Sequence, residues 1–561
     1  MLLDARSVRH GATVRADLCV VGAGASGITL VRELAGQAFD VCLLESGGER
    51  YDRRTQSLYR GDNVGLPYIP LHRSRLRCFG GSTNHWTGWC RRLDPIDFEA
   101  RDWVPHSGWP FGGAELDAHY ARAHRLCQLG DDRYDVAAWE SETSPRLPLD
   151  GERLRSKIFQ FSPPTPFGRI YRDEIERAPN VTGYLRANAL ELETCAAGER
   201  VTRAHVATLD GGRFAVEAAV FVLATGGIEN ARLLLLSRQG PGTALGNRHD
   251  LVGRFFMEHP YLFSGVFRPA AGTAMGLYRI HRAETVQARG EILAALALTA
   301  EAQRQERILN GAVYFFPRPQ HKTYRRFASA AMVSAQHYVD ALRRGELPEN
   351  PIRDLRELIR GADDVAASAV RRAVALFRTA ERFSIRAFLE PAPDPESRVT
   401  LCARRDRLGQ PRARLAWRLG GLDRRTLARL HEILDDEIRR AGVGTIESHL
   451  EHGVTGWPAT LTGGAHHMGT TRMHDDPRQG VVDRDCRVHG VSNLYVAGSS
   501  VFPTAGHVNP TLTIVALALR LADHLKRQLG GGDRGNHARA PIPAAAPSLA
   551  DRDGRPTSGP D

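Results

Sequence analysis

Hydrophobic runs near the start of the chain predict a strand, a helix and a second strand in that order. Residues 17–21 read Asp-Leu-Cys-Val-Val, a short apolar run of the kind that forms a buried strand, and a glycine-rich turn and an amphipathic helix follow it. A second run of the same character, Val41-Cys-Leu-Leu44, ends at Glu45. Two apolar strands joined by a helix are typical of a βαβ unit with parallel strands.

The turn between the first strand and the helix has the glycine spacing of a dinucleotide-binding loop, Gly22-Ala-Gly-Ala-Ser-Gly27. In such a loop Gly22 permits the tight turn, Gly24 lets the backbone approach a pyrophosphate, and Gly27 lets the helix pack closely on the strand. Free N–H groups and the positive dipole end of the helix would then face the phosphates. Glu45 lies about 20 residues further on, where a carboxylate accepts hydrogen bonds from ribose hydroxyls and disfavours NADP. The spacing leaves FAD and NAD as alternatives, beside a glycine turn with no ligand.

The middle of the chain predicts a mixture of helices and strands. Helical periodicity runs from Glu291 to Ala302 and from Ile352 to Phe377, and Leu422 to Ala441 is strongly amphipathic. From residue 530 the chain is rich in Gly, Pro, Ala, Asp and Arg, so we expect a disordered tail over residues 531–561. Short apolar runs that predict strands are Ala312–Phe316, Val399–Cys402 and Arg414–Arg418.

Residues 461–518 combine three features that point to chemistry. A glycine-rich loop carries His466 and His467, a strand that follows it ends at Gly498, and Asn509-Pro510 opens a long apolar run. Asn is a favoured helix N-cap and Pro a favoured first helical residue, so this pair predicts the start of a helix. Histidines in glycine-rich loops are more often surface residues than catalytic ones, so the loop has a plain structural interpretation as well.

Two further motifs separate FAD from NAD. They are Arg77-Cys-Phe-Gly-Gly-Ser-Thr-Asn-His-Trp86 and Val222-Leu-Ala-Thr-Gly-Gly-Ile-Glu-Asn-Ala231. Together with the N-terminal glycine loop and residues 461–518, they resemble the glucose–methanol–choline (GMC) family of FAD oxidoreductases. The resemblance covers roughly residues 15–530. It is strongest to the branch that holds pyranose 2-oxidase and the flavin subunits of fructose and gluconate dehydrogenases.

The resemblance implies an α/β fold class with two domains. A Rossmann-like FAD-binding domain would comprise residues 15–250 and 455–530, and an α+β substrate-binding domain with a mainly antiparallel sheet would comprise residues 251–454. A chain of 561 residues is long enough to bury two such cores.

The resemblance also implies that a CH–OH group of a sugar, polyol, glycoside or related alcohol is oxidised to a carbonyl. In that branch the base is the histidine three residues before a Gly-Thr pair, which is His466 here, with His467 as its adjacent competitor. His466 would remove the hydroxyl proton while hydride passes to flavin N5, and Asn509 would hydrogen-bond the same oxygen. His507 would line the pocket at best, and His259 is interpreted as structural. The alternatives are oxidation of a hydrophobic natural-product alcohol, a non-redox lyase that keeps FAD, and a flavin-binding module without catalysis.

FAD is the cofactor that the resemblance implies, and no metal site is expected because the eight cysteines show no CxxC pair and no metal spacing. In pyranose 2-oxidase a histidine in a Gly-Gly-x-x-x-His-Trp segment is bonded to the 8α-methyl of FAD, and His85 holds that position here. The residues before it, Ser82-Thr83-Asn84, differ, so a covalent bond through His85 is the less favoured of two alternatives. The residues expected to contact FAD are Gly22, Gly24, Ser26, Gly27, Glu45, Arg77, Gly81, Asn84, His85, Ala189, Ala224, Gly226, Gly498, Asn509, Pro510 and Thr511.

The charge and hydropathy of the chain argue against some classes of partner. The net charge is +11, but the only lysines are Lys157, Lys322 and Lys526, and the arginines are scattered, so nucleic acid is not expected as a partner. No apolar run of about 20 residues lacks charges, and residues 1–15 lack an apolar signal core, so neither a transmembrane segment nor a secretory signal is expected. We therefore expect cytoplasmic residence, with periplasmic residence by co-export alongside a signal-bearing partner as the alternative. O₂, a quinone and a cytochrome stay open as electron acceptors, and the dehydrogenase relatives suggest a small partner subunit.

Overall fold

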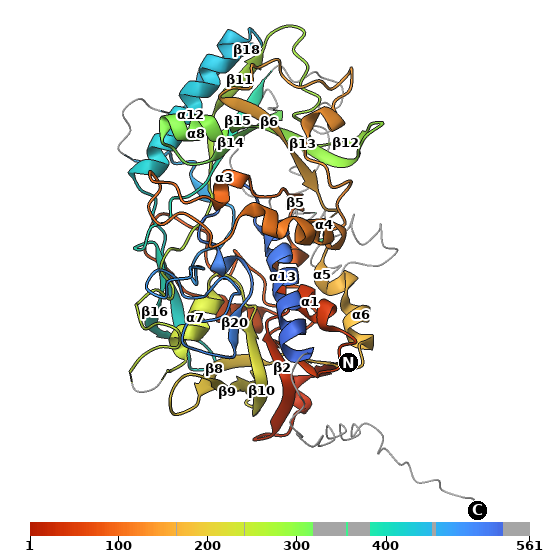
Figure 1. The fold of residues 1–561 in the computed structure, drawn as a ribbon, viewed down its shortest axis with the longest axis vertical. Coiled ribbons are helices and arrows are strands. Elements are labelled where there is room, and N and C mark those ends of the chain that lie inside the picture. Colours follow the sequence, from red (N-terminus) through yellow and green to blue (C-terminus); the bar gives the residue numbers. More distant parts are fainter. Residues whose placement is uncertain are drawn as a thin grey trace, which may run out of the picture.

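The computed structural model describes residues 1–163, 165–239, 242–317, 355–356, 359, 382–450 and 456–530. Figure 1 shows two large sheets stacked along the long axis of the molecule. Helix α12 (Gly421–Arg440) packs against the upper sheet, and α1 (Ala25–Leu34) lies beside α13 (Thr511–Gly530) on the lower one.

The lower sheet is parallel over most of its width and is built around the strand that precedes the glycine loop. That strand, β2 (Thr13–Val21), pairs in parallel with β3 (Val41–Glu45) on one side and with β10 (Arg213–Leu223) on the other. The strands predicted at residues 17–21 and 41–44 are therefore confirmed, and α1 completes the βαβ unit. Within the described residues the sheet has eight strands, in the order β1 (Leu2–Asp4), β7 (Val181–Leu185), β3, β2, β10, β9 (Val201–Ala207) and β8 (Asn188–Thr194), with β20 (Leu494–Val496) also paired to β10.

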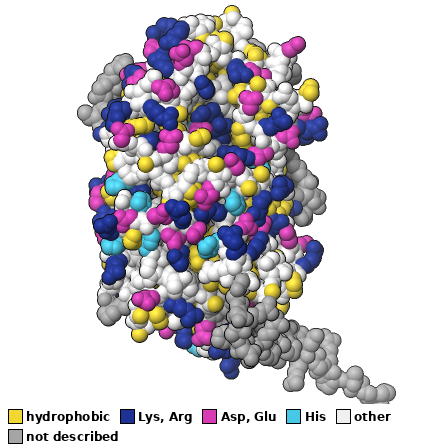
Figure 2. All heavy atoms as spheres, in the orientation of Figure 1, with side chains coloured by type: hydrophobic (Ala, Val, Ile, Leu, Met, Phe, Trp, Pro, Cys, Tyr) yellow, Lys and Arg dark blue, Asp and Glu magenta, His cyan; other side chains and the backbone are white. Residues whose placement is uncertain are grey.

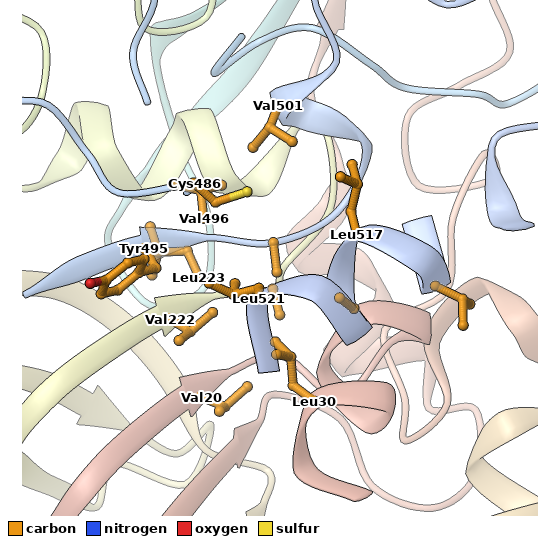
Figure 3. Close-up of a cluster of buried hydrophobic side chains, with 14 of the residues drawn as sticks. Val20, Leu30, Val222, Leu223, Cys486, Tyr495, Val496, Val501, Leu517 and Leu521 are labelled. Carbon is orange, nitrogen blue, oxygen red and sulfur yellow. The ribbon is translucent and has the colours of Figure 1, made fainter. Parts of the chain in front are cut away.

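Residues from the two ends of the chain pack in one hydrophobic core. β20 pairs in parallel with the last three residues of β10, and α13 packs against α1. Figure 3 shows Val20, Val222 and Val496 from three neighbouring strands in one cluster with Leu30 of α1 and Leu517 of α13. Each of these five side chains is at most 2% exposed, so the contact between the two ends of the chain is a core from which water is excluded.

The upper sheet is antiparallel at each of its strand pairings. A parallel-based α/β half and a mainly antiparallel half together are the fold class that the sequence predicts. In the described residues this sheet has nine strands, in the order β18 (Gly444–Ser448), β11 (Pro260–Pro269), β15 (Phe383–Leu389), β14 (Gly311–Pro317), β13 (Arg289–Leu298), β6 (Leu154–Phe161) and β5 (Trp89–Cys90), with β12 (His281–Glu284) on β13 and β19 (Thr462–Gly463) on β11.

The helix predicted from Glu291 to Ala302 is wrong, because most of this segment is strand β13. Residues 292–298 are all buried, and alternate side chains enter different cores: Leu293 packs in the cluster near the lower sheet, while Ile292 packs in the cluster under α12. A strand that is buried on both faces has no polar positions to reveal its two-residue period, so its apolar run does not differ from that of a buried helix. The helix that does occur, α8 (Ala300–Glu306), begins only after β13 has ended.

The other predicted elements of the middle agree with the structure where it describes them. The amphipathic helix predicted from Leu422 to Ala441 is α12, and the strand predicted at Ala312–Phe316 is β14. The remaining two predicted strands form a hairpin, β16 (Arg398–Arg405) and β17 (Pro411–Ala416), which pairs with β4 (Asp62–Asn63). The helix predicted over residues 352–377 and the tail over residues 531–561 lie outside the described residues, apart from residues 355, 356 and 359. Further helices are α2 (Arg53–Gln56), α3 (Pro95–Phe98), α4 (Asp117–Leu126), α5 (Phe167–Ile170), α6 (Arg172–Arg177) and α7 (Glu229–Leu236).

The chain crosses between the two sheets more than once. β5 and β6 belong to the upper sheet although they fall between strands of the lower sheet in the sequence. The domain boundaries at residues 250 and 455 therefore stay a prediction, and the strand pairings alone show that the first 250 residues contribute to both sheets.

Charges of both signs are interspersed on the molecular surface. Figure 2 shows basic and acidic side chains mixed over the whole visible face. Among the helices of the described segments, none combines the length and the apolar character that crossing a membrane requires.

Candidate active site

A cavity of about 390 Å³ lies where the two ends of the chain meet. The β2–α1 loop, residues that follow β3 and β10, and two C-terminal segments form its wall. Gly27 and Asn84 are not among the described residues of that wall, and the Asn84 amide donates instead to the Phe79 carbonyl at 2.8 Å. The predicted site residues that line the cavity are Gly22, Gly24, Ser26, Glu45, Arg77, Gly81, His85, Ala189, Ala224, Gly226, His466, Gly498, Asn509, Pro510 and Thr511.

Three glycines of the β2–α1 loop have the geometry that their spacing predicts. Gly22 has a φ of +105°, and a Cβ there would lie 2.6 Å from the carbonyl oxygen of Ala224, so no other residue fits. A Cβ on Gly27 would lie 1.9 Å from the oxygen of Gly22, which explains why the helix can pack so closely on the loop. A Cβ on Gly24 would meet no atom within 4 Å, because this position faces the open cavity.

The wall at this end of the cavity suits a pyrophosphate and a ribose. Gly24 is the N-cap of α1 and makes no side-chain capping bond, so N–H groups of the first helical turn are available to an anion. Glu45, at the end of β3, is 5% exposed and is held by the N–H groups of Ala23 at 2.9 Å and Gly47 at 2.7 Å. Oε1 also accepts from the Ser46 hydroxyl at 3.4 Å, whereas Oε2 accepts only from Ala23 among the described residues and keeps a lone pair that a ribose hydroxyl can use.

A cluster of buried charges forms the neighbouring wall. Arg75, Arg77 and Arg232 surround Glu229, and Arg232 also pairs with Asp406 at 2.7 Å. Burial alone would raise the pKa of Glu229, but the three guanidinium groups outweigh it and lower the pKa to about 2. Three guanidinium groups against two carboxylates leave this cluster with one net positive charge beside the cavity, which favours an anionic ligand.

The opposite end of the cavity brings His466 and Asn509 together, as the sequence predicts. Asn509 Nδ2 lies 3.3 Å from His466 Nε2, although the two residues are 43 positions apart. Burial lowers the pKa of His466 well below its usual value, and the positive charges that His259 and His467 would carry lower it further. The imidazole is therefore neutral near pH 7 and is able to accept a proton.

His467 has different partners from its neighbour. Its Nε2 lies 2.9 Å from the hydroxyl of Tyr68, which also bonds the Glu258 carboxylate. Burial and then the charge of Arg75 lower the pKa of His467 to about 3. The free nitrogen beside Asn509 thus belongs to His466, whereas the Nε2 of His467 is already occupied.

Sequence reasoning missed two residues that contact the His466 loop. The Glu258 carboxylate accepts the backbone N–H groups of Gly464 and His466, each at 3.0 Å, and burial raises its pKa to about 7 in spite of these bonds. His259, interpreted from sequence as structural, contacts the imidazole of His466 at 2.9 Å. A signal was present, because this polar pair interrupts the otherwise buried apolar segment Phe255–Pro260.

His507 does not line the cavity, so the expectation that it would do so is not met. Its side chain is fully buried, its ring packs 6.1 Å from that of Phe159, and its Nδ1 lies 3.8 Å from the carboxylate of Asp94. Trp89 takes a place that the sequence did not assign: it lines the cavity, with its ring 5.2 Å from that of Tyr314. Trp89, with the Tyr314 ring packed against it, is therefore an aromatic part of the cavity wall.

The comparison with known families decides the identity. A family model described as GMC oxidoreductase matches residues 393–518, which include both His466 and Asn509. Over these residues the chain is a GMC oxidoreductase. Among relatives of this GMC oxidoreductase, paromamine 6′-oxidase of Streptomyces fradiae is 26% identical over 90% of each chain. The fructose dehydrogenase large subunit of Gluconobacter japonicus is 24% identical and covers 93% of this chain and 99% of its own.

The fold comparison agrees with the sequence relatives. Pyridoxine 4-oxidase from Mesorbium loti superposes with a TM-score of 0.52 at 18% identity, over 92% of this GMC oxidoreductase and all of the other chain. At 18% identity this similarity shows that the two proteins share a fold and nothing more.

FAD is the cofactor of this GMC oxidoreductase, and the residues of the cavity fit it. Gly24 and Gly226 both leave open space where a Cβ would stand, the N-terminus of α1 offers unpaired donors, and Glu45 keeps free acceptors. The described residues hold no group of three or more His, Cys, Asp or Glu side chains placed to bind a metal ion. The protein is therefore a flavin-dependent oxidoreductase that acts on CH–OH donors.

Proposed function

We propose that this enzyme oxidises a CH–OH group of a sugar, polyol or glycoside to a carbonyl, with His466 as the base. The observation that carries the proposal is the contact of 3.3 Å between His466 Nε2 and Asn509 Nδ2 at the wall of the FAD cavity. Support for the substrate class comes from the relatives, of which fructose dehydrogenase is named for a sugar.

Each member of the pair has a defined task in this proposal. Neutral His466 takes the hydroxyl proton on Nε2, and the Asn509 amide donates to the same oxygen and so holds the carbon in place. Bound FAD supplies the two-electron acceptor that receives hydride from that carbon. The proton and the hydride together account for the two hydrogens that an alcohol loses when it becomes a carbonyl.

The substrate class is tested by anaerobic bleaching of the flavin. Sugars, polyols and glycosides should remove the flavin absorbance near neutral pH, and hydrophobic alcohols should leave it unchanged. Admission of air then shows whether O₂ restores the colour quickly, as in an oxidase, or slowly, as in a dehydrogenase. If only hydrophobic alcohols bleached the flavin, the substrate would be a hydrophobic alcohol and not a sugar, polyol or glycoside. A flavin that no alcohol bleaches would favour a non-redox lyase.

The role of the base is tested by replacing each histidine of the loop. His466→Ala should slow anaerobic flavin reduction by about 10²- to 10⁴-fold, the usual effect of losing a positioned base, while FAD stays bound. His467→Ala is the matched control and should have the smaller effect, because its ring is bonded to Tyr68. Stopped-flow absorbance measures both rates, and the reverse order would place the base at His467.

A partner subunit is a separate proposal. The fructose dehydrogenase chain that matches here is a large subunit, which favours a small companion for this enzyme too. Mass measurement of the natively isolated enzyme tests it, and a chain that is isolated alone with full activity toward its natural acceptor would contradict it.

A further inference from the structure

A row of hydrogen-bonding groups leads from the backbone through His259 to His466. The carbonyl oxygen of Gly506 lies 2.9 Å from His259 Nε2, and His259 Nδ1 lies 2.9 Å from Nδ1 of His466. The other ring nitrogen of His466 is the one beside Asn509. His259 is fully buried, so these neighbours rather than water decide where its proton lies.

One arrangement of protons satisfies all of these contacts. A carbonyl oxygen only accepts, so Nε2 of His259 carries the proton and donates to Gly506. Burial lowers the pKa of His259 to about 4, so the ring is neutral at pH 7 and its Nδ1 is an acceptor. Nδ1 of His466 must then carry a proton and donate to it. Because His466 is also neutral, its lone pair is left on Nε2, which faces Asn509 and the cavity.

We propose that His259 is a positioning residue, which fixes the tautomer of His466 so that Nε2 is the base. The inference rests on the proposed role of His466 and adds how the reactive nitrogen is selected. An imidazole without a partner at Nδ1 can place its single proton on either nitrogen, and the form with the proton on Nε2 cannot take one from an alcohol.

The backbone of the same loop is held by the residue before His259. Glu258 accepts the N–H of His466, and the two segments are joined by a backbone pairing between Met257 and Met468. Ala465 has a φ of +61°, a left-handed conformation that a residue with a Cβ adopts only when its surroundings impose it. The adjacent residues Glu258 and His259 therefore hold the backbone and the ring of His466, respectively.

The same contact serves the enzyme after proton transfer. Once His466 Nε2 has taken the proton, its Nδ1–H becomes the donor of a charge-assisted hydrogen bond to His259 Nδ1. Such bonds are stronger than neutral ones, so His259 stabilises the imidazolium that the reaction forms.

Two substitutions of His259 each keep the hydrogen bond of only one of its two ring nitrogens. In His259→Asn the amide oxygen can stand near the position of Nδ1 and accept from His466, while the contact to Gly506 is lost. In His259→Gln the longer side chain can still donate to Gly506 but offers no acceptor at the Nδ1 position. We expect the Gln variant to slow anaerobic flavin reduction by about 10- to 100-fold, the usual effect of losing a partner that orients an active group, and the Asn variant to stay close to wild type.

A measurement that does not depend on turnover reports the tautomer directly. Solid-state ¹⁵N NMR of the histidine-labelled holoenzyme distinguishes protonated from bare ring nitrogens, and the His466 signals are those lost in His466→Ala. Wild type and His259→Asn should show a protonated Nδ1 and a bare Nε2 on His466. His259→Gln should show a mixture of the two tautomers.

The spectrum and the reduction rates can each contradict the role proposed for His259. A wild-type spectrum with the proton of His466 on Nε2 overturns the inference, even if neither variant folds. A Gln variant as fast as wild type overturns it too, whereas a slow Gln variant with normal FAD content supports it. If His466→Ala itself has no effect on flavin reduction, the proposed function fails; if it does slow the reaction and only the His259 results disagree, this inference alone fails.

Discussion

His85 lines the cavity, and in the sequence it holds the position of the histidine that is bonded to FAD in pyranose 2-oxidase. Burial lowers the pKa of this imidazole, so the ring is neutral and its chemistry does not forbid the bond. We nevertheless expect noncovalent FAD, because Ser82, Thr83 and Asn84 replace the residues that precede the bonding histidine in pyranose 2-oxidase. Acid precipitation should give a colourless pellet and a yellow supernatant. A yellow pellet that loses its colour in His85→Ala would show that the bond exists.

The residues that sequence could identify are those whose signal is local. His466 and Asn509, which both line the cavity, each lie in a short motif with its own glycines or helix start, so the sequence alone could propose them as site residues. It could not propose His259, because the importance of this residue comes from a contact with a residue 207 positions away. That contact exists only once the backbones at Met257 and Met468 have paired, and nothing in the sequence near either histidine specifies this pairing.

At the scale of the element, the N-terminus of α1 offers a test of the cofactor site. Gly24 has an extended backbone with a φ of −83°, which any residue adopts, and a Cβ there would enter empty space in the cavity. Gly24→Val should therefore fold normally and yet bind little FAD, because the side chain occupies the approach to the phosphates. Absorbance of the purified protein measures bound flavin, and its melting temperature reports the fold.

Gly112 supplies the matched control for this substitution. It is exposed, and a Cβ there would also meet no atom within 4 Å, but it does not line the cavity. Gly112→Val should be as yellow as wild type. Equal flavin content in the two variants would show that Gly24 does not face the cofactor.

Helix α12 carries a buried histidine whose ring makes no hydrogen bond to the described residues. His431 is buried on the same helix as the core residues Leu427, Leu430 and Leu434, and neither of its ring nitrogens has a hydrogen-bond partner in the described structure. Burial lowers its pKa to about 4. Since the unfolded chain takes up a proton near pH 6.5, this residue costs stability as the pH falls from about 6.5 toward 4.

His431→Leu should consequently stabilise the protein, and more so in acid. We expect its advantage over wild type to grow by about 2 kcal/mol between pH 7 and pH 5. His10→Leu, at an exposed position, is the control for the loss of a histidine as such. Melting curves at both pH values decide the matter: an advantage that shrinks in acid would mean that His431 has a partner or is protonated when folded.

The elements that sequence predicted well are those with one buried face. α12 alternates leucines with charged positions over 20 residues, so its period is visible. Strand β13 is buried on both faces and has no such period, so its sequence alone does not distinguish it from a helix. The burial of the second face is a property of the assembled molecule, because it depends on which elements cover each side of the sheet.

At the scale of the whole molecule, a buried ion pair ties distant parts of the chain together. Arg101 and Glu390 are joined by two hydrogen bonds, their side chains are 1% and 0% exposed, and Glu390 also accepts the backbone N–H of Asn310. Arg101→Met should destabilise the protein by about 3–5 kcal/mol, because it leaves a carboxylate buried without its counter-charge. The melting temperature, measured with FAD bound, should fall accordingly.

The control is a pair of the same type at the surface. Arg304 and Glu99 are 43% and 44% exposed, so Arg304→Met should change stability by no more than about 1 kcal/mol. If the two variants had the same melting temperature, the burial of the Arg101–Glu390 pair would make no difference to stability.

The partnership of β20 with β10 has a consequence for how the enzyme is made. A growing chain emerges from the ribosome with its N-terminus first, so β2, α1 and β10 are available while residues 494–530 are still to be synthesised. Until those residues arrive, one strand of the lower sheet, the helix that packs on α1 and the Asn509 side of the cavity are all missing. We therefore expect flavin to bind only after residues 494–530 have been synthesised and have packed on the N-terminal part of the sheet. Nascent chains that stall before residue 494 would leave the apolar edge of β10 open to other proteins in the cell.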